Sequence, residues 1–255
     1  MQRMPVLFVG HGSPMNSIEE NVFTDGWRSM ARDITKPKAI LCVSAHWFVE
    51  ANLVSAAESP KTIHDFYGFP ESLYEITYPT PGAPAYAQTI VALSKGVVQQ
   101  VPDRGLDHGA WSVLRFMYPK ADVPVLQLSV HAGNTPAQSF QMGRMLSALR
   151  GEGVLIIGSG NIVHNLSLVS WDMEGGFPWA DDFDRYIKTA ILSGRYDDVL
   201  RYTLAGGSAN HAFVGRDHYD PLLYALGATD AGESIQVYND ARVLGSLSMT
   251  SYRIG

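Results

Sequence analysis

The chain has 255 residues, of which 46% are hydrophobic and 17% charged, and its formal net charge is -6. This composition is typical of a globular protein that buries a large core without disulfides or a structural metal. No block of like charges appears, which argues against nucleic-acid and anionic-membrane partners. No apolar run approaches the ~18 residues of a membrane span, and the N-terminal apolar stretch is too short for a signal peptide. The single cysteine, Cys42, is compatible with a reducing compartment, so we expect a soluble cytoplasmic protein.

Apolar segments with strand character alternate with helical segments along most of the chain. We predict strands at Val6–Gly10, Ala39–Ala45, Leu53–Ala56, Val97–Val101, Val123–Val130 and Val154–Gly158. Helical spacing of apolar residues predicts helices within residues 19–34, 83–96 and 136–153, and again over much of 178–227. Residues 234–240 and 246–254 have the character of late strands.

This alternation predicts an α/β fold. Strands that alternate with helices form βαβ units, which place the strands parallel in one sheet and the helices on its faces. We therefore predict a single domain over residues 1–255, with a mostly parallel central sheet flanked by helices. The two late strands are expected to form an antiparallel edge.

Histidines lie at or just past the ends of several predicted strands: His11, His46, His131 and His164. The carboxyl ends of parallel strands share one edge of a sheet, and ligands bind there in open α/β folds. Imidazole is a common ligand of zinc and non-heme iron. The matched placement of His11 and His46 favours a functional role, whereas His131 belongs to the site or only lines the crevice. For His211 we favour a structural role at a helix end.

The glycines before His164, in "GSGN" (residues 158–161), resemble a nucleotide-binding loop only weakly. The third glycine and the Walker lysine of such loops are missing. We interpret the segment as a sharp turn that brings His164 to the crevice. His218 opens the predicted helix "DHYDPLLYALG", where it faces either solvent or a site.

Five short motifs occur in a specific order: "FVGHGSPM", "VSAHW", "DHGAWSVL", "GSGNIVHN" and "DHYDPLLYALG". With these motifs the chain resembles the class III extradiol ring-cleavage dioxygenases from about Met4 to Ile254. The resemblance is greatest to the branch that contains the 4,5-DOPA extradiol dioxygenases.

The resemblance implies roles for five histidines. His11 and His46 match the first two metal ligands, and His218 matches the third, where another branch of the family has a glutamate. His164 matches a histidine that acts as acid and base near the metal and approaches the metal in some members, so it is expected as a catalytic residue and as a ligand. His108 matches a second catalytic histidine, which handles substrate or oxygen.

The implied activity is metal-dependent insertion of both atoms of O2 into a DOPA-like catechol, which gives a ring-opened semialdehyde. Non-heme Fe(II) is the metal expected for activity, and an all-histidine ligand set also suits Zn²⁺. Two alternatives stay open: a zinc-binding hydrolase, and a non-enzymatic metal- or peptide-binding protein of the same fold. The physiological catechol and the oligomeric state are not determined by the sequence.

Other residues near these motifs have two interpretations each. The aromatic loop, which we define as His64–Tyr74, is expected to close over the substrate ring, and we place His64 on this loop rather than in the pocket. Asp107 and Asp217 either orient an imidazole or cap a helix locally. Arg104 is a candidate cation for a substrate carboxylate, although an exposed loop arginine is the preferred interpretation.

Overall fold

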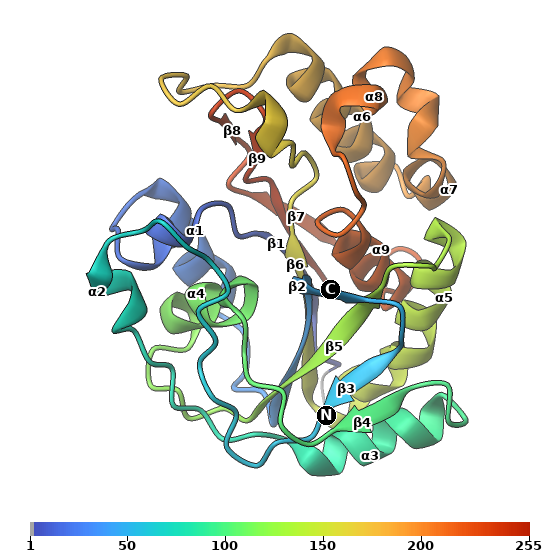
Figure 1. The fold of residues 1–255 in the computed structure, drawn as a ribbon. Coiled ribbons are helices and arrows are strands. Elements are labelled where there is room, and N and C mark those ends of the chain that lie inside the picture. The colour runs from blue at the N-terminus through green and yellow to red at the C-terminus, as the bar shows by residue number, and fades with distance from the viewer. Residues whose placement is uncertain (1–2) are drawn as a thin grey trace.

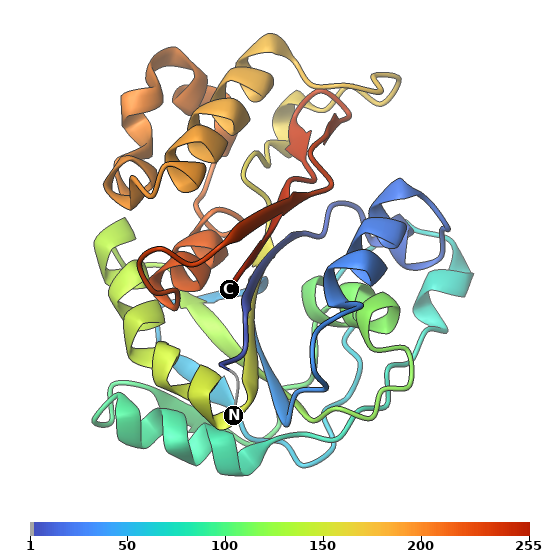
Figure 2. The same ribbon diagram turned by 180° about the vertical axis from the view of Figure 1, so that it is seen from behind.

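The structure is a computed structural model and describes residues 3–255. A twisted central sheet carries helices on both faces (Figures 1 and 2). Its strand order is β4-β3-β5-β2-β6-β1-β10-β7. The strands are β1 (Val6–Gly10), β2 (Ala39–Val49), β3 (Leu53–Ser55), β4 (Gln99–Val101), β5 (Val125–His131), β6 (Val154–Gly160), β7 (Ile235–Tyr238) and β10 (Ser251–Ile254). A separate small sheet pairs β8 (Arg242–Val243) with β9 (Leu247–Ser248).

The centre of the large sheet is parallel. Strand β2 pairs in parallel with β5 and β6, and β6 pairs in parallel with β1. Strand β10 runs antiparallel to both β1 and β7, so the two late strands form an antiparallel edge. At the other edge β3 pairs antiparallel with β5 and parallel with β4. The predicted α/β fold with a mostly parallel sheet and an antiparallel edge is confirmed.

The helices divide between the two faces of the sheet (Figure 1). One face carries α1 (Val22–Ala31) and α4 (His108–Met117), with α2 (Glu71–Tyr74) on the same side. The other face carries α3 (Pro84–Leu93), α5 (Pro136–Leu146) and α9 (Asp220–Gly227). Helices α6 (Pro178–Leu192), α7 (Tyr196–Leu200) and α8 (Ala209–Ala212) pack together at one end. No helix formed by residues 3–255 is both long and apolar enough to cross a membrane.

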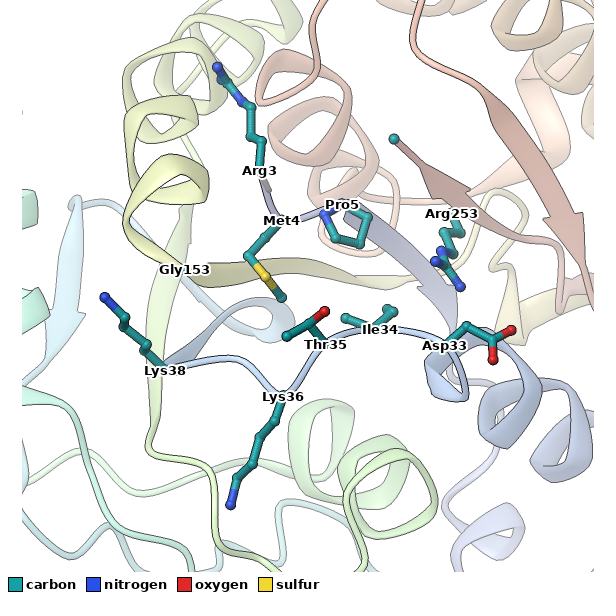
Figure 3. A pocket seen from close by; sticks show the side chains of 11 residues that line it. Arg3, Met4, Pro5, Asp33, Ile34, Thr35, Lys36, Lys38, Gly153 and Arg253 are labelled. Carbon is teal, nitrogen blue, oxygen red and sulfur yellow. The ribbon is translucent and has the colours of Figure 1, made fainter. Parts of the chain in front are cut away.

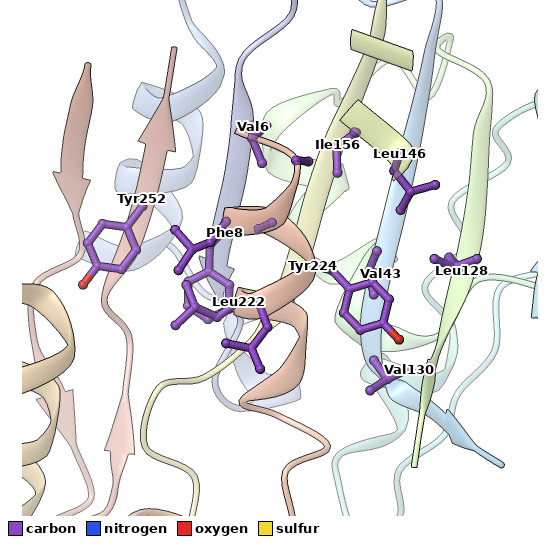
Figure 4. Close-up of a cluster of buried hydrophobic side chains, with 14 of the residues drawn as sticks. Val6, Phe8, Val43, Leu128, Val130, Leu146, Ile156, Leu222, Tyr224 and Tyr252 are labelled. Carbon is purple, nitrogen blue, oxygen red and sulfur yellow. The ribbon is translucent and has the colours of Figure 1, made fainter. Parts of the chain in front are cut away.

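Each central strand buries side chains on both faces, as parallel strands covered by helices do. Val6 and Phe8 of β1 pack into the cluster that includes Tyr224 of α9 (Figure 4). The intervening Leu7 and Val9 point into the opposite cluster, under α1 and α4. The continuous apolar run that predicted β1 therefore reflects burial in two separate cores.

The central strands extend further than predicted at their carboxyl ends. Strand β2 continues past Ala45 to Val49, because pairing with β5 resumes at Phe48 after an irregularity that begins beyond Ser44. Strand β6 continues through Gly160. A register shift depends on a partner strand and leaves no periodic pattern in the sequence. This irregular part of β2 contains His46, so it helps to shape the site described next.

Candidate metal centre

Three adjacent strands bring histidines to the carboxyl edge of the sheet. His11 directly follows β1, His46 lies in the irregular part of β2, and His164 follows the end of β6. Strand β6 lies between β2 and β1, so the three strand ends are neighbours. His218 lies just before α9 rather than inside it, because that helix begins at Asp220. The prediction that strand ends gather histidines at one edge is confirmed for these residues.

His11, His46 and His218 each offer one nitrogen to a common point. The three nitrogens lie within 4.8 Å of one another. The Nε2 atoms of His11 and His46 are 3.1 Å apart. The Nε2 atom of His218 is buried and has no hydrogen-bond partner among residues 3–255. Three imidazole nitrogens that face one another away from water form an arrangement that fits a metal ion.

The second nitrogen of His11 has a partner that sets the position of the ring proton. Its Nδ1 lies 3.0 Å from Oγ of Ser159, and the Ser159 hydroxyl donates to the carbonyl of Gly109 at 2.5 Å. Because that hydroxyl proton is used on Gly109, Ser159 accepts a hydrogen bond from Nδ1–H of His11. The lone pair of His11 is then on Nε2, where the other imidazoles converge.

Carboxylates lie beside the Nδ1 atoms of the other two imidazoles. Nδ1 of His218 is hydrogen-bonded to Oδ2 of Asp217 at 2.6 Å, which directs the lone pair of His218 to Nε2. Nδ1 of His46 lies 3.2 Å from Oδ2 of Asp65 as an ion-pair contact, and the negative charge of Asp65 favours a proton on that nitrogen. Hydrogen bonds at Nδ1 therefore fix the ring proton of His11 and His218.

The environment keeps these imidazoles neutral. Burial, and then the neighbouring histidines, hold the pKa values of His11 and His218 well below the ordinary value of 6.5. Burial and the proximity of His108 lower the pKa of His46 to about 3. A histidine binds a metal ion only as the neutral base, so the donor set is ready for a cation near neutral pH.

His164 lies beside this group rather than within it. Its ring stacks on the ring of His218, with centroids 3.4 Å apart and an interplanar angle of 4°. One of its nitrogen atoms groups with Asp217 and His218, not with His11 and His46. Burial lowers the pKa of His164 to about 4. The geometry places His164 next to the centre, and its expected role as a ligand stays a prediction.

His108 is the first residue of α4 and reaches the same centre. Its ring centroid lies 3.8 Å from that of His46, and its Nδ1 is 3.1 Å from Oδ2 of Asp65. The start of α4 approaches β2 closely because residue 109 is glycine. A Cβ atom on Gly109 would lie 2.5 Å from Oγ of Ser44 and 3.0 Å from Cδ2 of His46. Glycine is therefore required where His108 meets His46.

The two aspartates that precede key histidines have different roles. Asp217 binds its neighbouring imidazole, as described above. Asp107 instead caps α4, where its carboxylate accepts the backbone N–H of Ala110, and it lies in a fully buried network. Ser44 and Gln127 donate to Asp107 at 2.6 and 2.8 Å. Of the two predicted alternatives, Asp217 orients an imidazole and Asp107 caps a helix.

Arg104 is partly buried and paired, and its role toward a substrate carboxylate stays a prediction. Its guanidinium donates to Asp107 at 3.0 Å and lies over the ring of Trp47, 4.9 Å from the centroid. The side chain is only 22% exposed. The interpretation as an exposed loop arginine was wrong, because the buried carboxylate of Asp107 attracts the guanidinium.

The glycines of "GSGN" serve close packing against the segment around His218. They lie in β6 and at its end, so the predicted sharp turn was wrong. A Cβ atom on Gly160 would lie 2.1 Å from the carbonyl oxygen of His218, and one on Gly158 would lie 2.3 Å from that of Pro221. Without side chains at these positions, the backbone of His218 and of the first turn of α9 packs directly on β6 and brings His218 to the centre.

Three other histidines lie outside the centre. Nδ1 of His131 accepts a local hydrogen bond from the backbone of Gly133 at 3.0 Å, in the turn after β5. His211 is exposed in the last turn of α8, at the helix end where it was predicted. His64 lies half-buried in the aromatic loop, as expected, and its ring lies against Trp111.

Sequence reasoning missed two residues of the centre, Asp65 and Ser159. Asp65 lies in the aromatic loop, and Ser159 lies between the glycines of β6. Neither stands at a spacing that marks a partner for an imidazole. The only signal was indirect, because a histidine that binds a metal ion usually donates its other N–H to a protein acceptor.

A cavity at the opposite edge of the sheet offers no comparable donor set (Figure 3). It has a volume of about 230 Å³ and is lined by residues that precede β1, β2 and β6, together with Arg253 of β10 and Gly255. The basic side chains of Arg3, Lys36 and Lys38 point in different directions rather than toward a common point. The histidine cluster is therefore the stronger candidate site.

Comparisons with known proteins agree with this choice. The family model described as the catalytic LigB subunit of aromatic ring-opening dioxygenase matches residues 4–252. A protein of Escherichia coli K12 named 4,5-DOPA dioxygenase extradiol is 44% identical, over 99% of this chain and 95% of its own length. A protein of Beta vulgaris with the same name is 37% identical, over 96% of this chain and 94% of its own length.

Solved structures point in the same direction. The crystal structure of an uncharacterized protein from Escherichia coli K12 superimposes with a TM-score of 0.87 and 40% identity, over 99% of this chain and 100% of that one. The chain therefore belongs to the LigB family of aromatic ring-opening dioxygenases, whose similar members named above are of the extradiol type.

Proposed function

We propose that this chain is a metal-dependent dioxygenase that opens the ring of a catechol. Both atoms of O2 enter the product, a semialdehyde, and the ring is cut beside the two hydroxyl groups rather than between them. The similar proteins named 4,5-DOPA dioxygenase extradiol support a DOPA-like substrate. The observation that carries the proposal is the convergence of three imidazole nitrogens on one buried point.

His11, His46 and His218 would hold the metal ion through their Nε2 atoms. A bound Fe(II) supplies Lewis acidity toward the catechol hydroxyls and the redox chemistry that makes O2 reactive. Neutral imidazoles also suit Zn²⁺, so purified protein is expected to bind zinc as well. The residues of the site extend from position 11 to position 218, which supports one catalytic domain over residues 1–255.

His164 and His108 are the proposed catalytic residues. With a pKa of about 4, His164 is neutral near pH 7 and can accept a proton from a substrate hydroxyl. His108 donates from Nδ1 to Asp65, so its Nε2 can accept a hydrogen bond from the bound catechol. The aromatic loop excludes water at this point, where the ring of Phe66 lies 5.5 Å from that of His108.

The two alternative functions are less well supported. A zinc hydrolase commonly pairs its metal with a carboxylate general base. Here the carboxylates of Asp65 and Asp217 are held by the Nδ1 atoms of the histidines. A non-enzymatic binding protein is disfavoured by the membership in an enzyme family.

The proposed function is tested by reconstituting the protein with Fe(II) in the absence of air, then adding L-DOPA and air. We expect uptake of one molecule of oxygen for each molecule of DOPA, together with the yellow absorbance of the semialdehyde. His164→Ala should lose this activity, and His131→Ala is the matched control because His131 lies outside the centre. No oxygen uptake with DOPA or with a panel of simpler catechols would overturn the proposal.

A further inference from the structure

One carboxylate of the aromatic loop contacts two histidines of the centre. Oδ1 of Asp65 accepts the backbone N–H of His108 at 2.8 Å. Oδ2 of Asp65 lies 3.1 Å from Nδ1 of His108 and 3.2 Å from Nδ1 of His46. The Asp65 side chain is 21% exposed although it belongs to a surface loop. A single oxygen atom therefore lies between two imidazoles that have different proposed roles.

The chain around Asp65 has few other attachments to the centre. Residues 63–70 lie outside helices and strands. The backbone of Ile63 donates to Leu106 at 2.7 Å, and its carbonyl accepts from Nε1 of Trp111 at 2.8 Å. Beyond this anchored residue, Asp65 is the point at which the aromatic loop contacts both His46 and His108.

The partners of the other two proposed ligands come from elsewhere. His11 uses Ser159 of β6, a strand in the middle of the sheet. His218 uses Asp217, its own neighbour in the chain. His46 and His108 instead share one group, which belongs to the aromatic loop. Displacement of the aromatic loop would release both rings at once.

From this geometry we propose that Asp65 is a positioning residue that couples the aromatic loop to the metal centre. Its carboxylate sets the Nδ1–H tautomer of His108 through a hydrogen bond and favours the same tautomer at His46 through its negative charge. His46 then presents the Nε2 lone pair to the metal ion, and His108 presents its Nε2 lone pair to the substrate. The inference rests on the proposed function for the identity of the metal site, and it adds a residue to that site.

An amide at position 65 cannot perform this task. Asparagine has the shape of aspartate but only one acceptor oxygen, and its NH2 group would face an N–H donor. If the NH2 group takes the place of Oδ2, both imidazoles must move a proton to Nε2 or turn away. If the amide oxygen takes that place, the NH2 group faces the backbone N–H of His108 and the negative charge beside both rings is lost. If His46 moves its proton to Nε2 or turns away, it no longer has a lone pair at the point where the three nitrogens converge.

The first test is the zinc affinity of the full chain, measured in competition with a chromophoric chelator. We expect Asp65→Asn to weaken zinc binding about 10- to 100-fold, the usual range for loss of a partner that orients a histidine ligand. Asp103→Asn is the matched control, since Asp103 is an exposed carboxylate near α4 and should leave the affinity unchanged. Affinity of Asp65→Asn within about twofold of the wild-type value would overturn the inference.

A second measurement needs no variant at position 65. Two-bond ¹H–¹⁵N correlation spectra of zinc-free protein labelled at histidine nitrogens report which nitrogen of each ring carries the proton. His46→Gln and His108→Gln assign the two sets of signals. Without metal, the 3.1 Å contact between the Nε2 atoms of His11 and His46 needs a proton on one of them, so His108 is the diagnostic ring. We expect Nδ1–H at His108, and Nε2–H there would overturn the inference even if Asp65→Asn does not fold.

Neither measurement depends on turnover. If the wild-type protein consumes no oxygen with any catechol while Asp65→Asn loses zinc affinity, the proposed function fails and the role of Asp65 stands. If the protein cleaves catechols and Asp65→Asn binds zinc normally, the proposed function stands and the role of Asp65 fails.

Discussion

Two buried polar regions at opposite edges of the same sheet differ in how completely their groups are paired. Arg150 is fully buried, and its Nε and Nη1 atoms donate to the carbonyls of Met4 and Ala228 at 2.7 and 2.9 Å. Its remaining donors pair with the carboxylate of Glu233. In the metal centre, by contrast, Nε2 of His218 has no partner among the described residues, and the Nε2 atoms of His11 and His46 face each other.

This difference separates a structural role from a functional one. Arg150 ties the segment before β1 to the end of α9 and to Glu233, and every contact favours the folded chain. Buried nitrogen atoms without partners lower stability, so their presence at a strand edge indicates a ligand that completes them. Both regions bury polar groups, but only the groups around Arg150 all have hydrogen-bond partners.

The largest expected effect is that of His11→Ala on the metal centre. Loss of a hydrogen-bond partner of a ligand lowers metal affinity by up to about 100-fold. Zinc affinity should fall further in His11→Ala, because the ligand itself is removed. The metal-free variant should melt only slightly lower than metal-free wild type, since the substitution removes only the side-chain contacts of His11 with Ser159 and His46. Chelator competition and thermal unfolding in the presence of a chelator measure the two effects. A much lower melting temperature without metal would mean that His11 is structural.

Arg150→Met tests the other region. Removing one partner of a buried ion pair costs about 3–5 kcal/mol, because the remaining groups stay buried without a partner. Glu233 is only 18% exposed, and the carbonyls of Met4 and Ala228 would lose their donor. Urea unfolding measures the loss, and zinc affinity should stay unchanged. Arg28→Met, in an exposed ion pair with Glu20, is the control and should cost less than about 1 kcal/mol. If Arg150→Met had the same free energy of unfolding as wild type, the Arg150 region would not have the structural role that distinguishes it from the metal centre.

Asp184 is an intermediate case, with hydroxyl partners but no close cation. Thr250 donates to it at 2.7 Å, whereas Nη1 of Arg242 is 3.9 Å away. Burial raises its pKa from 3.8 to about 6, against the effect of the Thr250 hydrogen bond. The folded chain therefore holds this proton more tightly than the unfolded chain, and the resulting stability is lost as the pH rises through about 6.

This contribution is at most about 3 kcal/mol. Asp184→Asn has no proton to lose, so the stability of wild type relative to the variant should decline from about pH 4 to about pH 7. Unfolding free energies of both proteins across this interval measure the decline. A constant difference would show that Asp184 stays charged throughout.

The smallest expected effect is that of Ser159→Ala. His11 loses the acceptor of its Nδ1 proton, and zinc affinity should fall about tenfold while the fold is kept. Ser139→Ala is a matched control, since Ser139 is also fully buried but bonds to Asp220. Equal zinc affinity in the two variants would show that the hydrogen bond from His11 to Ser159 does not contribute to zinc binding.

The fold was largely predictable because its signals are local. Strand β1 has the predicted bounds, and apolar residues alternate between two cores along it. The positions of His11 and His164 follow from where strands end in a parallel sheet. His46 was also placed correctly, although the irregularity of β2 that carries it was not foreseen.

The sequence alone thus determined the α/β fold, the edge at which histidines gather, and the family. Only the tertiary structure decided which nitrogen of each ring is free, because that depends on partners from distant segments. Ser159 reaches His11 across two paired strands, and Asp65 reaches His46 and His108 from a loop without regular structure. Periodicity records which face of an element is buried, whereas a hydrogen bond between two such segments is set by how the whole chain packs.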